Sequence, residues 1–370
     1  MRRTFRASPE KSTRRRVIVD AVSIRDVRSY RQLELALEPG LVLVTGPNGA
    51  GKTNLLEAVH LATQGLSFRT RHDAQIVRNG ATAARVAIRG LRGQVGVRAE
   101  VTLSRETPKR IRLDGANVAS ADELRRKVHT LVFTPDRLAV VKGGPATRRA
   151  YFDRALARVL PARADVPTAY ASGLAQRNAA LRRAGAGLSG PEALEPWTER
   201  VVELARALVD ARRQLVSLLA PAFADRSAEL GLAGGILAYD GEAPTRAALD
   251  ERLSRDLERG TTGLGPHLDD VRLLAGDRDL RMFGSQGEQR TAVLSLLLAE
   301  AGVLTDQVGI PPLLLLDDAL SELDADRRRL LSTRLGSVGQ TLVTATGAEA
   351  LPLAPAQLLV VTPGRVTAAA

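Results

Sequence analysis

The stretch Gly46-Pro47-Asn48-Gly49-Ala50-Gly51-Lys52-Thr53 has the pattern G-x-x-x-x-G-K-T of a phosphate-binding loop. The apolar, β-branched residues 41–45 precede it and predict a buried parallel strand. Residues 54–63 follow with the apolar spacing of an amphipathic helix. The glycines let backbone N–H groups face phosphate oxygens at the N-terminus of that helix. This context favours a nucleotide site over a chance glycine-rich turn.

Two carboxylates supply the second part of the predicted site. Residues 313–316 are four leucines, and Asp317 and Asp318 come directly after them. An aspartate at the carboxyl end of a buried strand beside a phosphate loop holds the Mg²⁺ shell, so Asp317 is predicted to bind Mg²⁺ together with the Thr53 hydroxyl. Lys52 is predicted to reach the outer phosphates. Asp318 is predicted to orient or activate the attacking water.

Composition narrows the class of protein. The 370 residues allow two or three domains, and 44% of them are hydrophobic, which supports large cores. No apolar run approaches 18 residues, so we expect a soluble protein with no membrane partner. The absence of cysteine excludes disulfides, thiol catalysis and Cys-type zinc sites, and it favours the cytoplasm. The four histidines lack metal-ligand spacing.

The net charge of +12 is unevenly distributed. Residues 1–16 carry seven basic residues and one acidic residue, which is half of the excess. We expect these residues to form a basic disordered arm; a mis-set start, a cloning remnant or a mitochondrial leader are the alternatives. The remaining charge suits a polyanionic partner.

The distribution of patterns predicts two lobes. Residues 17–37 and 85–103 alternate as antiparallel strands do, and Asp114-Gly115 marks a hairpin. Strand patterns return at residues 271–274, 280–283, 340–344 and 358–361. We therefore expect an α/β fold. A discontinuous ATPase lobe, residues 17–134 and 268–370, would contain a mixed sheet with helices and an antiparallel meander, and residues 135–267 would form a mostly helical lobe.

The helical lobe is predicted to contain a helical hairpin. The residues that carry the pattern are spaced alternately by 4 and 3, as in a coiled-coil seam: Trp197, Val201, Leu204, Leu208, Ala211, Leu215 and Leu218. Tyr170, Leu174, Arg177 and Leu181 have the same spacing, and residues 185–191 predict a tight reversal between the two segments. The longer helix, residues 195–220, would be about 39 Å long. The alternative is an ordinary helical bundle.

A turn that is rich in small residues precedes the aspartate pair in sequence, and the apolar helix predicted at residues 292–301 follows this turn. The turn contains Ser285-Gln286-Gly287-Glu288-Gln289, about 30 residues before the strand that ends in Asp317. With the phosphate loop, this turn resembles the signature loop of ABC-type ATPases, and the segment from Ser321 to Asp324 resembles their D-loop. The resemblance implies that the signature loop of one chain closes on ATP held by another. The ATP site would then be composite, across a head-to-tail homodimer.

The spacing of these motifs separates the subclasses of ABC-type ATPases. Ser285 lies 233 residues after Lys52, a longer gap than in transporter subunits. Residues 341–346 lack the histidine of the transporter switch strand, and Asp318 replaces the usual glutamate. These departures weaken the alternative of a transporter-type ATPase subunit. A P-loop kinase would not need the signature loop, and the guanine-specificity motif Asn-Lys-x-Asp is absent.

Shorter motifs discriminate further. They are Thr134-Pro135-Asp136 in place of a glutamine loop, Gly143-Gly144-Pro145 with Arg148-Arg149, and Gly265-Pro266-His267; Phe68-Arg69-Thr70 also matches. With these motifs the chain resembles the RecF family of bacterial recombination mediators from residue 22 to residue 361. The resemblance implies a weak, Mg²⁺-dependent ATPase that dimerises on DNA when it binds ATP. It also implies the partners RecO and RecR, a cytoplasmic, nucleoid-associated location, and roles in recombinase loading at gaps, replication restart and the SOS response.

DNA contacts are expected from arginines of the helical lobe. The candidates are Arg148, Arg149, Arg177, Arg182 and Arg183. The alternative for each of them is a solvated helix face.

Overall fold

The computed structural model describes residues 17–369, and the predicted basic arm, residues 1–16, lies outside them. By its internal contacts the chain divides into two compact units. The first contains residues up to 137 and from 304 onward, and the second contains residues 138–303. Residues 268–303, which the sequence patterns assign to the ATPase lobe, therefore belong to the second unit of this division.

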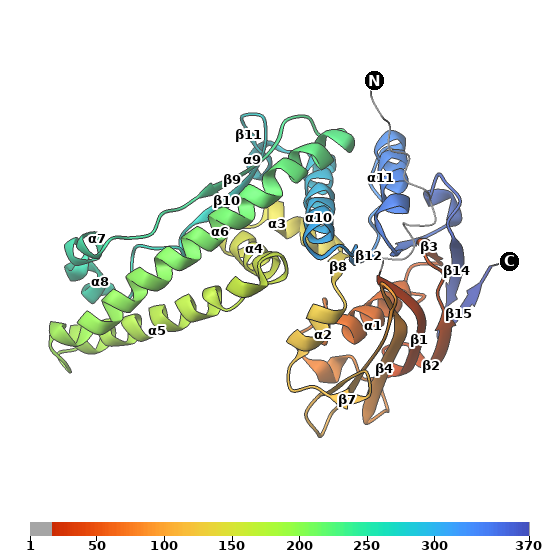
Figure 1. Ribbon diagram of the computed structural model, residues 1–370, viewed down its shortest axis with the longest axis horizontal. Coiled ribbons are helices and arrows are strands. Elements are labelled where there is room, and N and C mark those ends of the chain that lie inside the picture. The colour runs from red at the N-terminus through yellow and green to blue at the C-terminus, as the bar shows by residue number, and fades with distance from the viewer. Residues whose placement is uncertain (1–16, 370) are drawn as a thin grey trace. The chain divides into compact units, whose positions relative to one another are not determined.

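The first unit contains a mostly parallel sheet, shown in Figure 1, with the strand order β15-β14-β3-β13-β12-β8. Every residue of β3, β12, β13 and β8 is buried, as expected for parallel strands covered on both faces. The strands are β3 (Leu41–Thr45), β8 (Thr130–Phe133), β12 (Leu313–Leu316), β13 (Thr341–Ala345), β14 (Gln357–Thr362) and β15 (Arg365–Ala368). The last of them pairs antiparallel with β14.

A second sheet in the same unit is antiparallel, in the order β2-β1-β4-β5-β6-β7. It confirms the predicted meander, and its last hairpin turns at Asp114 and Gly115. The strands are β1 (Val17–Val27), β2 (Tyr30–Ala36), β4 (Ala83–Arg92), β5 (Val95–Ser104), β6 (Arg110–Leu113) and β7 (Ala116–Asn117). The helices of this unit are α1 (Lys52–Gln64), α2 (Ala121–Lys127) and α11 (Ala325–Val338).

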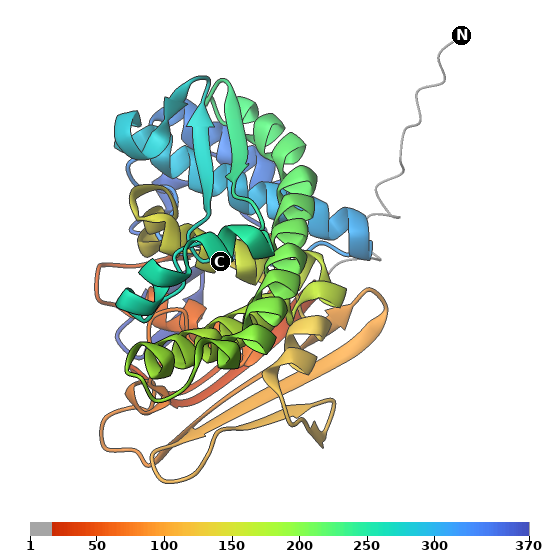
Figure 2. The ribbon, with the colours of Figure 1, turned by 90° about the vertical axis from the view of Figure 1, so that its left-hand side faces the viewer.

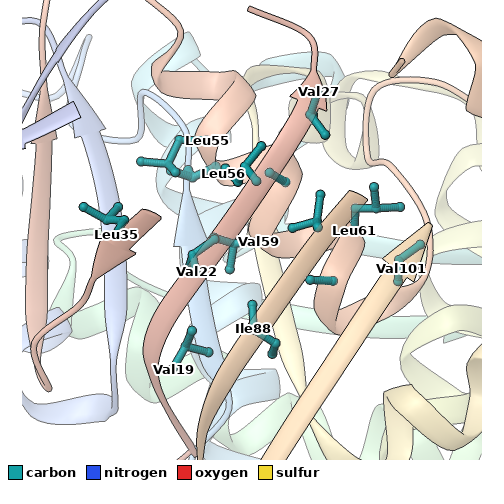
Figure 3. Packing of buried hydrophobic residues seen from close by; sticks show 14 of the residues in the cluster. Val19, Val22, Val27, Leu35, Leu55, Leu56, Val59, Leu61, Ile88 and Val101 are labelled. Atoms are coloured by element: carbon teal, nitrogen blue, oxygen red, sulfur yellow. The ribbon is translucent and has the colours of Figure 1, made fainter. Parts of the chain in front are cut away.

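Helix α1 joins the two sheets into one core. Figure 3 shows four side chains of this helix, Leu55, Leu56, Val59 and Leu61. They lie beside residues of the antiparallel sheet, among them Val22, Ile88 and Val101. The same cluster includes residues of β3, β12, β13 and β14. Each fully buried side chain of this kind contributes about 1.5–3 kcal/mol. The core therefore fixes the start of α1, and with it the phosphate loop, against both sheets.

In the second unit, α5 (Val166–Gly185) and α6 (Glu195–Glu229) form the predicted helical hairpin, which Figure 1 shows lengthwise and Figure 2 shows from the end that carries the turn. Val201, Leu204 and Leu208 of the seam are buried, but Trp197 is 38% exposed. The predicted end of α6 at residue 220 is wrong. Pro221 removes one backbone donor, yet the helix continues because Phe223 beyond it is fully buried.

The other elements of the second unit are short. They are α3 (Ala139–Lys142), α4 (Pro145–Val159), β9 (Gly235–Asp240), α7 (Arg246–Glu251), α8 (Leu253–Arg259), β10 (Asp270–Ala275), β11 (Arg278–Asp279) and α9 (Leu280–Phe283). The strand predicted at residues 280–283 is wrong. Asp279 accepts a hydrogen bond from the backbone N–H of Arg281 and thereby starts a helical turn.

Helix α10 (Gln286–Val308) follows the predicted signature loop. In the described part of the chain it is the one helix long and apolar enough to cross a membrane by length and composition. Of the 18-residue apolar stretch within this helix, 72% is buried inside the structure, as in the core helix of a globular domain.

Candidate functional site

The phosphate loop connects β3 to α1 through left-handed backbone positions. Gly46, Gly49 and Gly51 have φ values of 150°, 80° and 115°. A Cβ atom at Gly46 would lie 2.3 Å from the carbonyl oxygen of Val361, so the close approach of β14 requires glycine there. Gly51 caps α1, which begins at Lys52. This is the geometry that directs a helix N-terminus at an anion.

Lys52 lies over the loop. Its Nζ donates hydrogen bonds to the carbonyl oxygens of Gly46, at 2.6 Å, and Pro47, at 3.0 Å. Burial lowers the pKa of Lys52, and the charges of Asp317 and Asp318 act in the opposite direction. The three side chains are therefore electrostatically coupled, as expected of a cation and two carboxylates that serve one ligand.

The two halves of the predicted site meet at the carboxyl ends of the parallel strands. Thr53 Oγ1 donates to Asp317, at 3.0 Å from Oδ1 and 2.9 Å from Oδ2. The sequence reasoning did not assign a role to Thr344, whose Oγ1 donates to Asp317 Oδ1 at 2.8 Å and accepts from the backbone N–H of Asp318 at 2.9 Å. Leu316 is paired with Val343, so the parallel register places Asp317 beside Thr344.

Asp318 differs from Asp317 in exposure and backbone. Asp317 is buried, whereas Asp318 is exposed and has a left-handed φ of 52°. Ser321, the first residue of the predicted D-loop, donates its hydroxyl to Asp318 Oδ2 at 2.9 Å. Asp324 instead caps α11 by accepting from the backbone N–H of Arg327 at 2.8 Å. The strained backbone turns the Asp318 carboxylate toward solvent, where a water molecule can reach it.

The oxygens of Thr53 and Asp317 fit Mg²⁺, which prefers oxygen ligands and takes few of them from protein when phosphates are present. The described residues include no cluster of three or more His, Cys, Asp and Glu side chains that could hold a metal ion. Bound there, Mg²⁺ would neutralise charge on the phosphates.

A buried carboxylate on α1 organises the residues beside the loop. Glu57 is fully buried and accepts from Arg28 at 2.8 and 2.9 Å and from Ser67 at 2.5 Å. Burial alone would raise the pKa of Glu57, but these hydrogen bonds and the nearby charges lower it below its ordinary value. Arg69 lies 3.6 Å from Glu57 and donates to Asn54 in the first turn of α1. The Phe68-Arg69-Thr70 motif was the only sequence signal of this network.

The predicted signature loop forms the N-terminus of α10. The backbone N–H of Ser285 donates to Glu288 at 2.8 Å, and the N–H of Glu288 donates to Ser285 Oγ at 3.2 Å, a reciprocal capping box. Hydrogen bonds from Arg278 and from the Ser285 backbone lower the pKa of Glu288 to about 2. Gln289 is buried, whereas Ser285 and Gln286 are exposed and Gly287 is half-buried. The loop is thus preorganised with its serine at the surface.

Two of the predicted DNA contacts are wrong. Arg148 is 4% exposed and pairs with Asp270 at 2.6 and 2.7 Å, and Arg177 is 1% exposed and pairs with Asp256 at 3.1 Å. A guanidinium buried in this way compensates a buried carboxylate and is not available to a phosphate. The seam spacing with Tyr170 and Leu181 already indicates an interior position for Arg177, and the DNA prediction did not use that signal.

The other three candidates keep some exposure. Arg149 is half-buried and donates to the backbone oxygen of Asp269 at 2.6 Å. Burial and the charge of Arg212 lower its pKa. Arg182 and Arg183, near the end of α5, are exposed, and Arg182 lies 3.5 Å from the backbone oxygen of Gly260.

Replacing Arg177 by alanine should lower the free energy of unfolding by about 3–5 kcal/mol, because Asp256 would remain buried without its cation. Replacing Arg183, an exposed neighbour on the same helix, should change it by less than about 0.5 kcal/mol. Thermal unfolding of both variants measures the difference. Equal melting temperatures would contradict the structural role of Arg177.

The fold and the site define an ABC-type P-loop ATPase head. In agreement, residues 18–367 match the family described as the RecF/RecN/SMC N-terminal domain. A DNA replication and repair protein RecF from Heliobacterium modesticaldum is 35% identical over 356 residues, which cover 92% of this chain and 95% of the relative. RecF of Anaeromyxobacter dehalogenans strain 2CP-C is 38% identical over 347 residues, 88% of this chain and 91% of that relative.

Solved structures agree with this assignment. A structure of the recombination mediator protein RecF with ATP, from the RecFOR pathway, has a TM-score of 0.84 at 26% identity and covers 96% of this chain and 98% of its own. A head domain of Smc from Pyrococcus furiosus shares the fold, with a TM-score of 0.58 at 15% identity over 95% of this chain and 96% of its own. The chain belongs to the RecF family. The resemblance and fold class predicted from the sequence are confirmed, and the transporter alternative is not.

Proposed function

We propose that this protein is an ATP-dependent DNA-binding protein of recombinational repair. The observation that carries the proposal is the convergence of Thr53 and Asp317 beside the phosphate loop, at distances of 2.9 and 3.0 Å. The names of the RecF relatives, and the similarity to RecF solved with ATP in the RecFOR pathway, support the biological setting.

The chemistry proposed for the site follows from its side chains. Backbone N–H groups of the loop and Lys52 would hold the phosphates of ATP, and Thr53 with Asp317 would hold Mg²⁺. Asp318 would position the attacking water and accept its proton. Because Asp318 is shorter than a glutamate and already accepts a hydrogen bond from Ser321, we expect slow hydrolysis.

We propose that the ATP site is completed by a second copy of the chain. Ser285 is exposed at a helix N-terminus, where its hydroxyl and the N–H of Gly287 would meet the γ-phosphate bound by the partner copy. ATP would then hold the dimer together, and hydrolysis would release it. For this reason we retain residues 17–134 and 268–370 as the functional ATPase lobe, although residues 268–303 belong to the other compact unit.

The remaining parts of the proposal concern partners and location. We propose that the dimer forms on DNA at gaps, acts with RecO and RecR in recombinase loading, and supports replication restart and the SOS response. The description of the similar structures as parts of the RecFOR pathway supports the two protein partners. We propose a cytoplasmic, nucleoid-associated location.

Replacing Lys52 by arginine should abolish ATP-driven dimerisation, because the planar guanidinium is bulkier than the ammonium group that fits the loop. Size-exclusion chromatography with and without ATP, and then with DNA, tests the proposal and the variant together. The unaltered protein should change from monomer to dimer on ATP addition and then bind DNA. An unaltered protein that stays monomeric with ATP, or a variant that still dimerises, would contradict the proposal.

A further inference from the structure

The antiparallel sheet of the first unit has one core face and one solvent face. On β1, β4, β5 and β6 the buried residues alternate with exposed ones, as expected for a sheet packed on one side. The cross-strand register assigns six exposed arginines to the solvent face. They are Arg25, Arg85, Arg89, Arg98, Arg110 and Arg112, and we call this surface the arginine face.

The arginines of this face stand opposite one another. Arg25 of β1 is paired with Arg85 of β4, and Arg89 of β4 is paired with Arg98 of β5. Side chains directly opposite in an antiparallel pair have Cβ atoms about 4.5–5.5 Å apart, and like charges there are destabilising. The sheet therefore contains two pairs of opposing arginines that repel each other. A surface that only faces water does not need such pairs.

The surrounding acids compensate only part of this charge. Glu34 and Glu100 are the acidic residues that share the face between Ala21 and Asn117. Arg85 pairs with Glu100 at 2.5 Å, and Arg89 pairs with Asp20 at 3.0 Å. Within residues 17–369, the exposed side chains of Arg25, Arg98 and Arg110 form no salt bridge.

Some exposed arginines elsewhere in the protein are matched by acids, whereas others, such as Arg206, Arg255 and Arg365, have no ion pair within residues 17–369. On α6, Arg200 pairs with Glu203, and on α11, Arg329 pairs with Asp326, each three residues away. Such matched charges are what an ordinary solvated surface shows. What distinguishes the arginine face is that its arginines stand opposite one another on neighbouring strands.

The rest of the face defines the kind of partner. Between Ala21 and Asn117 its other positions hold small or neutral polar residues and one leucine, Leu91, with no aromatic side chain. Surfaces that bind single strands stack bases on aromatic rings, and this face offers none. An apolar protein partner would likewise find little to bury. The surface suits a partner recognised through closely spaced negative charges alone.

We propose that the arginine face binds the phosphate backbone of double-stranded DNA without reading its sequence. The proposal rests on the DNA-binding function proposed above and gives it a location. From Arg85 to Arg89 the strand advances by about 13 Å, and duplex DNA carries one negative charge per about 1.7 Å of its axis. A duplex thus presents several phosphates over the length of the face, and their negative charge would relieve the repulsion between opposing arginines.

Replacing Arg25, Arg98 and Arg110 together by glutamine tests the location. Each lost phosphate contact should reduce the slope of log K against log salt by about 0.9, so the triple variant should lose about 2.7. At 0.15 M salt its affinity for a 30-base-pair duplex should fall on the order of 100-fold. Fluorescence anisotropy with ATP and Mg²⁺, over a series of salt concentrations, measures both quantities. The melting temperature should stay equal or rise, because repulsion is removed.

Two matched triples serve as controls. Glutamine at Arg200, Arg329 and Arg365, which are exposed, removes the same charge elsewhere and should leave the slope unchanged. Lysine at Arg25, Arg98 and Arg110 keeps the charge and should retain the slope. An arginine-face variant that binds duplex like the unaltered protein, or loses only single-strand binding, overturns the proposed location. Loss of binding in the lysine triple, or a lowered melting temperature in the glutamine triple, would also overturn it. If the unaltered protein binds no DNA, the proposed function itself fails.

Discussion

Replacing Asp317 by asparagine is expected to lower ATP hydrolysis by roughly 100-fold or more, because phosphoryl transfer depends on positioned charge and removal of one stabilising group costs about 10²–10³ in rate. The carboxylate accepts hydrogen bonds from Thr53 and Thr344, at 2.8–3.0 Å. An asparagine has the same shape and can still accept one of them, so the fold should survive. Single-turnover assays over a range of Mg²⁺ concentrations measure the effect.

The Mg²⁺ dependence is the sharper readout. Asparagine carries no charge, so the affinity of the variant for ATP should respond much less to added Mg²⁺ than that of the unaltered protein. Replacing Asp326 by asparagine makes the same chemical change nine residues away, at an exposed position, and should leave both quantities unchanged. Normal turnover and a normal Mg²⁺ response in the Asp317 variant would contradict the assigned role.

Replacing Ser285 by arginine is expected to abolish dimerisation and turnover while the isolated chain still binds ATP. Ser285 is exposed, and the phosphate loop lies in the other compact unit of the same chain. The substitution removes the hydroxyl from the helix cap, which costs about 0.5–2 kcal/mol locally, and adds a long side chain where the partner copy would approach. Nucleotide binding by calorimetry, and sizing with ATP, measure the two effects separately.

Threonine at the same position is the matched control. It keeps a hydroxyl that can accept from the N–H of Glu288, so dimerisation should be largely retained. If the arginine variant lost ATP binding as a monomer, Ser285 would act within its own chain, and the composite site would be wrong. If it dimerised and turned over ATP normally, the signature loop would have no role in this protein.

The sequence by itself determined the parts of the site that depend on local backbone geometry. The glycines of Gly46–Thr53 are needed because of left-handed backbone angles and the approach of Val361, and such requirements leave a fixed pattern in the chain. A run of four leucines ending in Asp317 and Asp318 likewise defines a buried strand and its polar end. These motifs, with the strand and helix patterns, were enough to predict the fold class, and the shorter motifs at Thr134, Gly143 and Gly265 carried the RecF resemblance.

Only the tertiary structure shows which charged side chains are accessible to solvent and which are paired with opposite charges in the interior. The seam spacing indicated that Arg177 faces inward, but only the tertiary structure shows that it compensates Asp256 there. The helix predicted to end at residue 220 continues through Pro221 to Glu229, and Phe223 in this extension is fully buried. Thr344 became part of the site only through the register of β12 and β13, and Arg25 became a neighbour of Arg85 only through the pairing of β1 and β4. The physical reason is the same in each case: burial and cross-strand contact depend on residues far apart in the chain, and periodicity reports only on near neighbours.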